Sequence, residues 1–209
     1  FQGGGAAAAL AVTGDIGGVG LRSIQPVHLT VDDQGSTAQG FFAIGEGEAA
    51  FGWRQAGSDS FAASATLRDL PASAFAAFSG VRADGLISGS APQWSVGAGL
   101  TGEAQHVATG FRVRGRIRRP VDLRISGRVA HEALRAELTA TSDDGLSASG
   151  EISARVATQA FPVRIASAGG TARWEVEGPA DAVWALVGGP DQSVSGSLSG
   201  QGEARFGPG

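Results

Sequence analysis

Apolar and polar residues alternate at every second position over much of the chain. The clearest stretch, residues 111–129, reads FRVRGRIRRPVDLRISGRV. Such alternation is typical of a β-strand with one face in water and the other on an apolar interior. Alternating runs continue at 134–139, 146–155, 163–165 and 174–176, and noisier ones precede them. The pattern therefore predicts an all-β protein.

The connections between these runs are short, which favours antiparallel neighbours. Parallel pairing needs long crossover segments, and the spacing of roughly 8 to 15 residues between strands leaves no room for them. Turn signals lie at RP (119–120), SDDG (142–145) and SAGG (167–170). In the first half we expect strands at 6–13, 27–31, 37–44, 48–55 and 61–67. The predicted arrangement is an antiparallel meander.

Two segments interrupt the alternation and resemble each other. In each, a proline (Pro71, Pro179) is followed by an apolar residue four positions later (Phe75, Val183), by another at seven, and by a glycine at nine. Proline suits the first turn of a helix and glycine its end, so each segment predicts a short helix. The match indicates one sheet segment over 1–209, with repeat units of about 1–91 and 92–209.

The two interruptions and the strands after them carry a resemblance. The sequences LPASAFAAF…GLISGSA (70–78, 85–91) and PADAVWALV…SVSGSLSGQGEARFG (179–187, 193–207) resemble the C-terminal region of the TamB family of AsmA-like bridge proteins. The resemblance implies an elongated β-taco, an antiparallel sheet folded into an open hydrophobic groove. It also implies an inner-membrane anchor, a periplasmic location in a Gram-negative bacterium, phospholipid transfer in outer-membrane biogenesis and a TamA-like barrel partner.

Elementary packing leads to a similar shape. A sheet of a dozen or more strands must hide its apolar face behind a second layer, by closure, or with an apolar cargo. That face is rich in Gly and Ala, which would fill a sandwich poorly. At about 4.8 Å per strand, roughly 14 strands would line about 65 Å of groove. The residues expected to line it are Val113, Ile117, Val121, Leu123, Ile125, Val129, Leu134, Leu138, Leu146, Ile152, Val163, Ile165, Trp174, Val176, Val194 and Leu198.

Composition excludes some classes of protein. The net charge is −4 and 42% of residues are apolar, which is not the composition of a disordered chain. Without Cys there is no disulfide or thiolate metal site. Lys, Asn, Tyr and Met are absent and all 16 basic residues are Arg, which suggests a GC-rich bacterial genome. The missing initiator Met leads us to expect a piece of a longer protein.

Candidate chemistry is sparse. The arginines at 112–128 alternate with apolar residues and are expected on a solvated outer face, not on nucleic acid. GAGLTG (97–102) lacks the following helix of a dinucleotide site, and SDDG predicts a hairpin tip, not a calcium loop. His28, His106 and His131 lack zinc-site spacing, and no nucleophile motif occurs. We therefore expect no enzyme, no cofactor and no metal, with Trp174 facing the groove and Trp184 packing the second helix over it.

Two hypotheses follow for function. The leading one is a conduit whose groove shelters phospholipid acyl chains, or nascent strands of outer-membrane proteins, between the inner and outer membranes. The alternative is a secreted adhesin or passenger β-solenoid, although the regular rung period of a solenoid is not seen.

Overall fold

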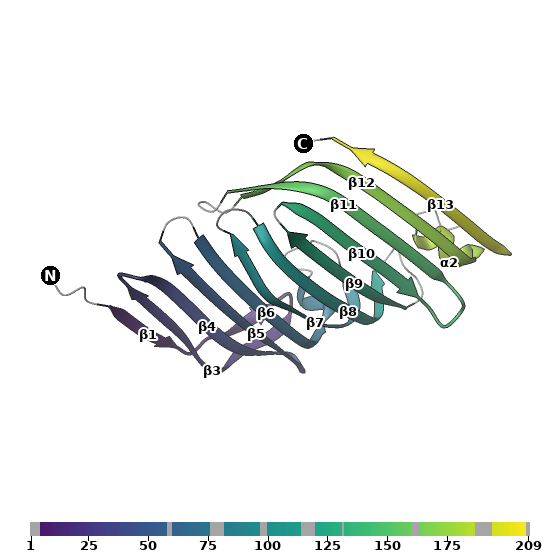
Figure 1. The fold of residues 1–209 in the computed structure, drawn as a ribbon. Coiled ribbons are helices and arrows are strands. Elements are labelled where there is room, and N and C mark those ends of the chain that lie inside the picture. Colours follow the sequence, from purple (N-terminus) through teal and green to yellow (C-terminus); the bar gives the residue numbers. More distant parts are fainter. Residues whose placement is uncertain are drawn as a thin grey trace.

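A computed structural model gives the fold as one open antiparallel sheet of 13 strands (Figure 1). Neighbours in the sheet follow chain order from β3 to β13, while β1 and β2 both pair with β3. The chain ends lie at opposite ends of the sheet (Figure 1). The structure describes residues 5–57, 60–75, 82–96, 100–113, 120–130, 132–159, 164–186 and 194–207.

The all-β antiparallel meander predicted from the alternation is confirmed. The strands are β1 (Ala6–Leu10), β2 (Thr13–Ile16), β3 (Val19–Asp32), β4 (Gly35–Ile44), β5 (Gly47–Ala56), β6 (Ser60–Pro71), β7 (Ala83–Val96), β8 (Leu100–Val113), β9 (Val121–Ala130), β10 (Ala133–Thr141), β11 (Ser147–Gln159), β12 (Arg164–Pro179) and β13 (Ser197–Phe206).

One predicted turn is confirmed and another is wrong. SDDG forms the turn between β10 and β11. SAGG (167–170), however, lies inside β12. Gly169 has a φ of 103°, and the pairing of β11 with β12 shifts register between Ala154 and Val156. The glycines therefore accommodate an irregularity in a continuous strand, where the local sequence suggested a chain reversal.

The two predicted helices lie six strands apart, directly after β6 and β12. The second is an α-helix, α2 (Ala180–Leu186), whereas the first is a 3-10 helix, η1 (Ala72–Phe75). Pro71 and Pro179 are the last residues of the preceding strands rather than part of a first helical turn. Among the described residues, no helix is long and apolar enough to span a membrane.

The register divides the sheet into two chemically different faces. Residues paired across antiparallel strands point to the same side. The odd-numbered residues 123–129 of β9 pair with the even-numbered residues 134–140 of β10, and the apolar set continues in register through β13. We call this side the apolar face. The intervening residues, such as Arg124, Arg128 and Glu137, form the polar face.

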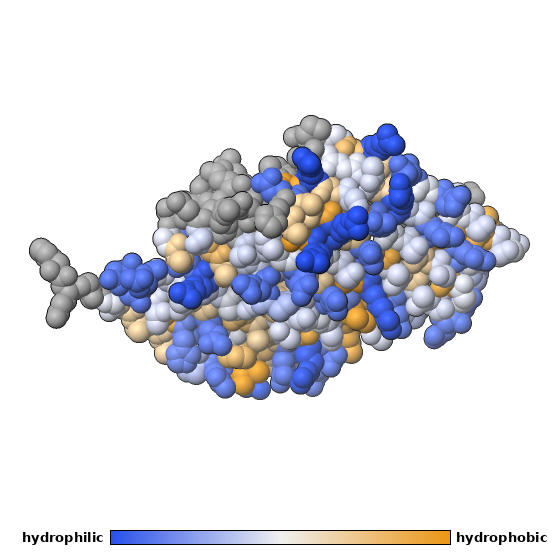
Figure 2. Space-filling model, in the orientation of Figure 1, coloured by the Kyte–Doolittle hydropathy of each residue, from blue (hydrophilic) through white to orange (hydrophobic). Residues whose placement is uncertain are grey.

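Charged side chains of the polar face are solvated and partly paired. Arg112 contacts Asp84 at 3.1 Å, and Arg173 contacts Glu203 at 3.0 Å. Hydrophilic residues are spread over the side of the molecule shown in Figure 2, with hydrophobic ones scattered between them. Arg112, Arg124 and Arg128 are exposed, as expected for a solvated outer face.

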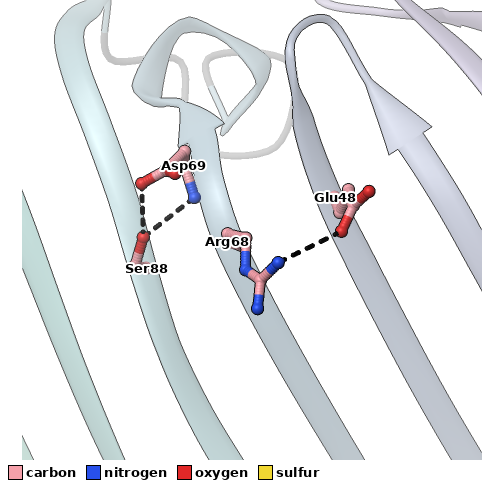
Figure 3. Close-up of polar contacts among 4 residues, drawn as sticks. All are labelled: Glu48, Arg68, Asp69 and Ser88. Carbon is pink, nitrogen blue, oxygen red and sulfur yellow. Dashed lines mark hydrogen bonds and ion pairs between the residues drawn. The ribbon is translucent and has the colours of Figure 1, made fainter.

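A bulge near the end of β6 changes which way its last residues point. Asp69 has a positive φ of 50°, and the register with β7 shifts between Leu67 and Leu70. The Asp69 N–H donates to Ser88 Oγ at 2.8 Å, and the Ser88 hydroxyl donates to Asp69 Oδ1 at 3.0 Å, beside the Glu48–Arg68 pair (Figure 3). The extra residue puts both Leu67 and Leu70 on the apolar face.

An open apolar floor between two covered rims

Burial along β9 changes sharply on one face of one strand. Val121 and Val129, near its two ends, are each 2% exposed, whereas Ile125 between them is 42% exposed. All three side chains lie on the apolar face, so alternation alone does not explain the difference. The ends of the strand are covered and its middle is open.

The same exposure continues on the neighbouring strands. Leu138 in β10 is 39% exposed, Ile152 in β11 is 42% exposed and Trp174 in β12 is 47% exposed. With Ile125 they form a strip across four adjacent strands, which we call the open floor. Within the part of the chain that the structure describes, no second layer of strands covers this strip.

The short helices and β2 cover the apolar face along one side of the sheet, at the ends of the strands. Val183 of α2 is buried with Val121 and Leu146, and Ala74 of η1 is buried with Ile44 and Leu70. We call these two clusters the helical rim. Ile16 and Val19, at the hairpin between β2 and β3, pack against the second cluster. Val183, rather than Trp184, is therefore the buried anchor of α2.

The opposite edge has its own cluster, which we call the far rim. Leu100, Val129 and Val156 are buried there, and Phe61, Trp94 and Leu134 pack against them. Each comes from the end of a strand opposite the helical rim. The apolar face is therefore covered along both rims and open between them. This is the burial profile of a trough.

The predicted groove residues divide between floor and rims. Ile125, Leu138, Ile152 and Trp174 form the open floor; Val121, Leu146, Leu123 and Val176 belong to the helical rim, and Val129 and Leu134 to the far rim. Leu198 in β13 is 39% exposed, while Val113 and Val194 are half-buried. Ile117 and Val163 lie outside the described residues, as does the side chain of Ile165.

The first half of the sheet supplies apolar-face residues that sequence reasoning missed. Phe51 and Trp53 in β5 are each 36% exposed, and Leu10 and Val31 are more so. The adjacent Phe41 and Phe42 break the alternation in the preceding strand, which hid the period of two. Phe51 and Trp53, two positions apart in one strand, were the available signal for this face.

One ionisable side chain occupies the apolar face of β8–β13 among the described residues. His106 pairs with Ile125 on one side and Gly89 on the other. Its Nδ1 atom is buried and has no hydrogen-bond partner. Apart from this imidazole and the N–H of the Trp174 indole, the described side chains on the apolar face of β9–β13 are hydrocarbon.

The polar face carries a shallow hollow of about 670 Å³ over β10–β13. Its polar lining includes Glu137, Glu151, Glu175 and the Arg173–Glu203 pair. The hydrogen bond and charge of Arg173 lower the pKa of Glu203 below its usual value. Among the described residues, no group of three or more metal-ligating side chains gathers here or elsewhere. The hollow is a solvated surface with structural ion pairs.

Comparisons with protein-family models, with curated proteins and with solved structures gave no match to this chain.

Proposed function

We propose that this chain is a segment of a periplasmic bridge protein whose apolar trough shields phospholipid acyl chains between the inner and outer membranes. The observation that carries the proposal is the uncovered floor: Ile125, Leu138, Ile152 and Trp174 are all at least 39% exposed in the middle of one sheet face. Large contiguous apolar patches on soluble proteins mark interaction sites.

The chemistry of the floor favours hydrocarbon over polypeptide as cargo. A peptide lying on the floor would bury backbone N–H and C=O groups without partners, at about 1–3 kcal/mol for each group. A methylene chain has no such groups and gains about 0.8 kcal/mol for each CH₂ removed from water. Contacts of this kind are non-directional, so a chain could slide along the floor.

The dimensions are compatible with this role. Twelve consecutive strands at about 4.8 Å spacing give roughly 55 Å along the sheet, against about 15 Å for one leaflet's hydrocarbon. The sheet could hold acyl chains end to end, but it would have to continue into further segments to join two membranes. The resemblance to the TamB family supports such a parent, anchored in the inner membrane and working with a TamA-like barrel.

The matched variants Ile152→Arg and Ser153→Arg test the proposal. Ile152 lies on the open floor, while Ser153 is the next residue on the polar face. Binding is measured with cis-parinaric acid, a fatty acid whose fluorescence rises in apolar surroundings. Because a buried charge without a partner is costly, Ile152→Arg should weaken binding at least about tenfold, with Ser153→Arg close to wild type.

Mass spectrometry of the purified wild-type chain gives an independent reading. Stoichiometric phospholipid supports the conduit, whereas none at all, together with no parinaric acid binding, would favour the passenger hypothesis. Co-purified polypeptide without lipid would point instead to nascent outer-membrane protein strands as the cargo. Equal binding by both arginine variants would remove the floor as the site.

A further inference from the structure

Five rings on the apolar face each lie over a glycine directly opposite on the neighbouring strand. A Cβ atom added at any of these glycines would come within 3.0 Å of the ring, closer than real Cβ atoms come to other atoms. The pairs are Phe51 over Gly40, Trp94 over Gly102, His106 over Gly89, Trp174 over Gly202 and Phe206 over Gly170.

Each glycine leaves the space over its backbone free, and ring atoms of its partner occupy that space. Aromatic side chains cover the exposed backbone of a cross-strand glycine, which restores apolar packing that glycine lacks. A ring that lies flat adds only about one van der Waals thickness, 3.5–4.0 Å, to the height of the floor. An upright ring would project across it.

Trp174 is the ring whose pose bears most directly on the open floor. It shares one cross-strand row with Ile125, Leu138, Gly150 and Gly202. The row runs across the strands, which is the direction in which a cargo would travel along the sheet. Gly150 lies between Leu138 and Trp174 in this row and adds no side chain to it. Only backbone lies near the position that a Cβ atom would take there.

We propose that Trp174 determines which cargo the trough accepts, and that its flat pose on Gly202 keeps the row clear for a single unbranched acyl chain. The proposal rests on the proposed function. A chain of methylene groups can lie across the face of the indole and pass from Leu138 towards β13. With the ring tipped upright, the same row is barred.

The chain offers a matched pair of substitutions for the test. In Gly202→Ala the new methyl group collides with the indole, which must leave its flat pose. In Gly200→Ala, on the same face of the same strand, the methyl group lies 3.9 Å from Val176 Cγ1, an ordinary contact. Both variants add one methyl group to β13, so they differ chiefly in what happens to Trp174.

Parinaric acid binding and tryptophan-to-parinaric energy transfer are the readouts. Gly202→Ala should weaken binding about tenfold, as expected for a misfit the size of one methylene group. Gly200→Ala should bind like wild type. In the Trp174→Ala background there is no ring to tip, so adding Gly202→Ala should not weaken binding beyond the loss caused by Trp174→Ala alone, which keeps the test decisive if Gly202→Ala alone folds poorly.

The outcomes separate this inference from the proposed function. Wild type that binds no parinaric acid contradicts the proposed function itself. Wild type that binds, with folded Gly202→Ala binding equally well, overturns only the role of Trp174. A further loss of binding when Gly202→Ala is added to Trp174→Ala would also overturn it, because that loss would come from the edge strand and not from the indole.

Discussion

The rims and the floor have the same sequence pattern and opposite environments. Leu70 at the helical rim is 2% exposed, whereas Leu138 on the floor is 39% exposed, although both are leucines on the apolar face. Buried side chains at the rims stabilise the sheet, while the floor leaves apolar surface in water at a cost to stability. A protein selected only for stability would cover the floor, so the difference is what the proposed role in binding a cargo would require.

The largest expected effect comes from truncating these two leucines. Leu70→Ala should lower the free energy of unfolding by about 2–4 kcal/mol, because it leaves a cavity among Ile44, Ala74 and their neighbours. Leu138→Ala removes a side chain that is already partly hydrated and should cost less than about 1 kcal/mol. Urea denaturation of both variants measures the contrast.

In a binding assay the two variants should rank in the opposite order. Leu138→Ala should weaken parinaric acid binding although the fold is intact, and folded Leu70→Ala should retain it. Equal losses of stability in the two variants would mean that the floor is covered in solution, and the division into rim and floor would be wrong.

A smaller effect is expected at the bulge that brings Leu70 to the helical rim. Ser88→Ala removes both hydrogen bonds that hold Asp69 at its positive φ. Because these bonds are exposed, the loss should be about 1 kcal/mol in thermal or urea unfolding. Ser90→Ala, two residues along β7 on the polar face, is the control and should change stability little. An equal loss in both variants would show that the bulge does not depend on Ser88.

The sequence predicted the strands and their faces because both follow from a period of two. It did not predict how deeply each side chain is buried, since nothing local distinguishes Val129 at the far rim from Ile125 on the floor. Burial at the helical rim depends on the two short helices and β2, and burial of Val129 at the far rim depends on Leu100 and Val156 from other strands. The overlay of Trp174 on Gly202 likewise depends on the register of two strands joined through α2.

The structural roles of the glycines were also not predictable from local sequence. In sequence they read as small residues that leave the trough empty, or as turns, as at SAGG. In the structure, Gly40, Gly102 and Gly202 receive rings from the next strand. Residue type alone could not separate these roles, because each depends on what lies opposite.

The smallest expected effect is at His106, the exception on the apolar face of β8–β13. Its buried Nδ1 lacks a hydrogen-bond partner, which costs stability. His106→Phe keeps a ring over Gly89 and removes the nitrogen, so the free energy of unfolding should rise by up to about 1 kcal/mol. His28→Phe, on the exposed polar face, should bring no such gain. If His106→Phe is instead destabilised, the imidazole has a partner in solution, and the apolar face is less uniformly hydrocarbon than its burial indicates.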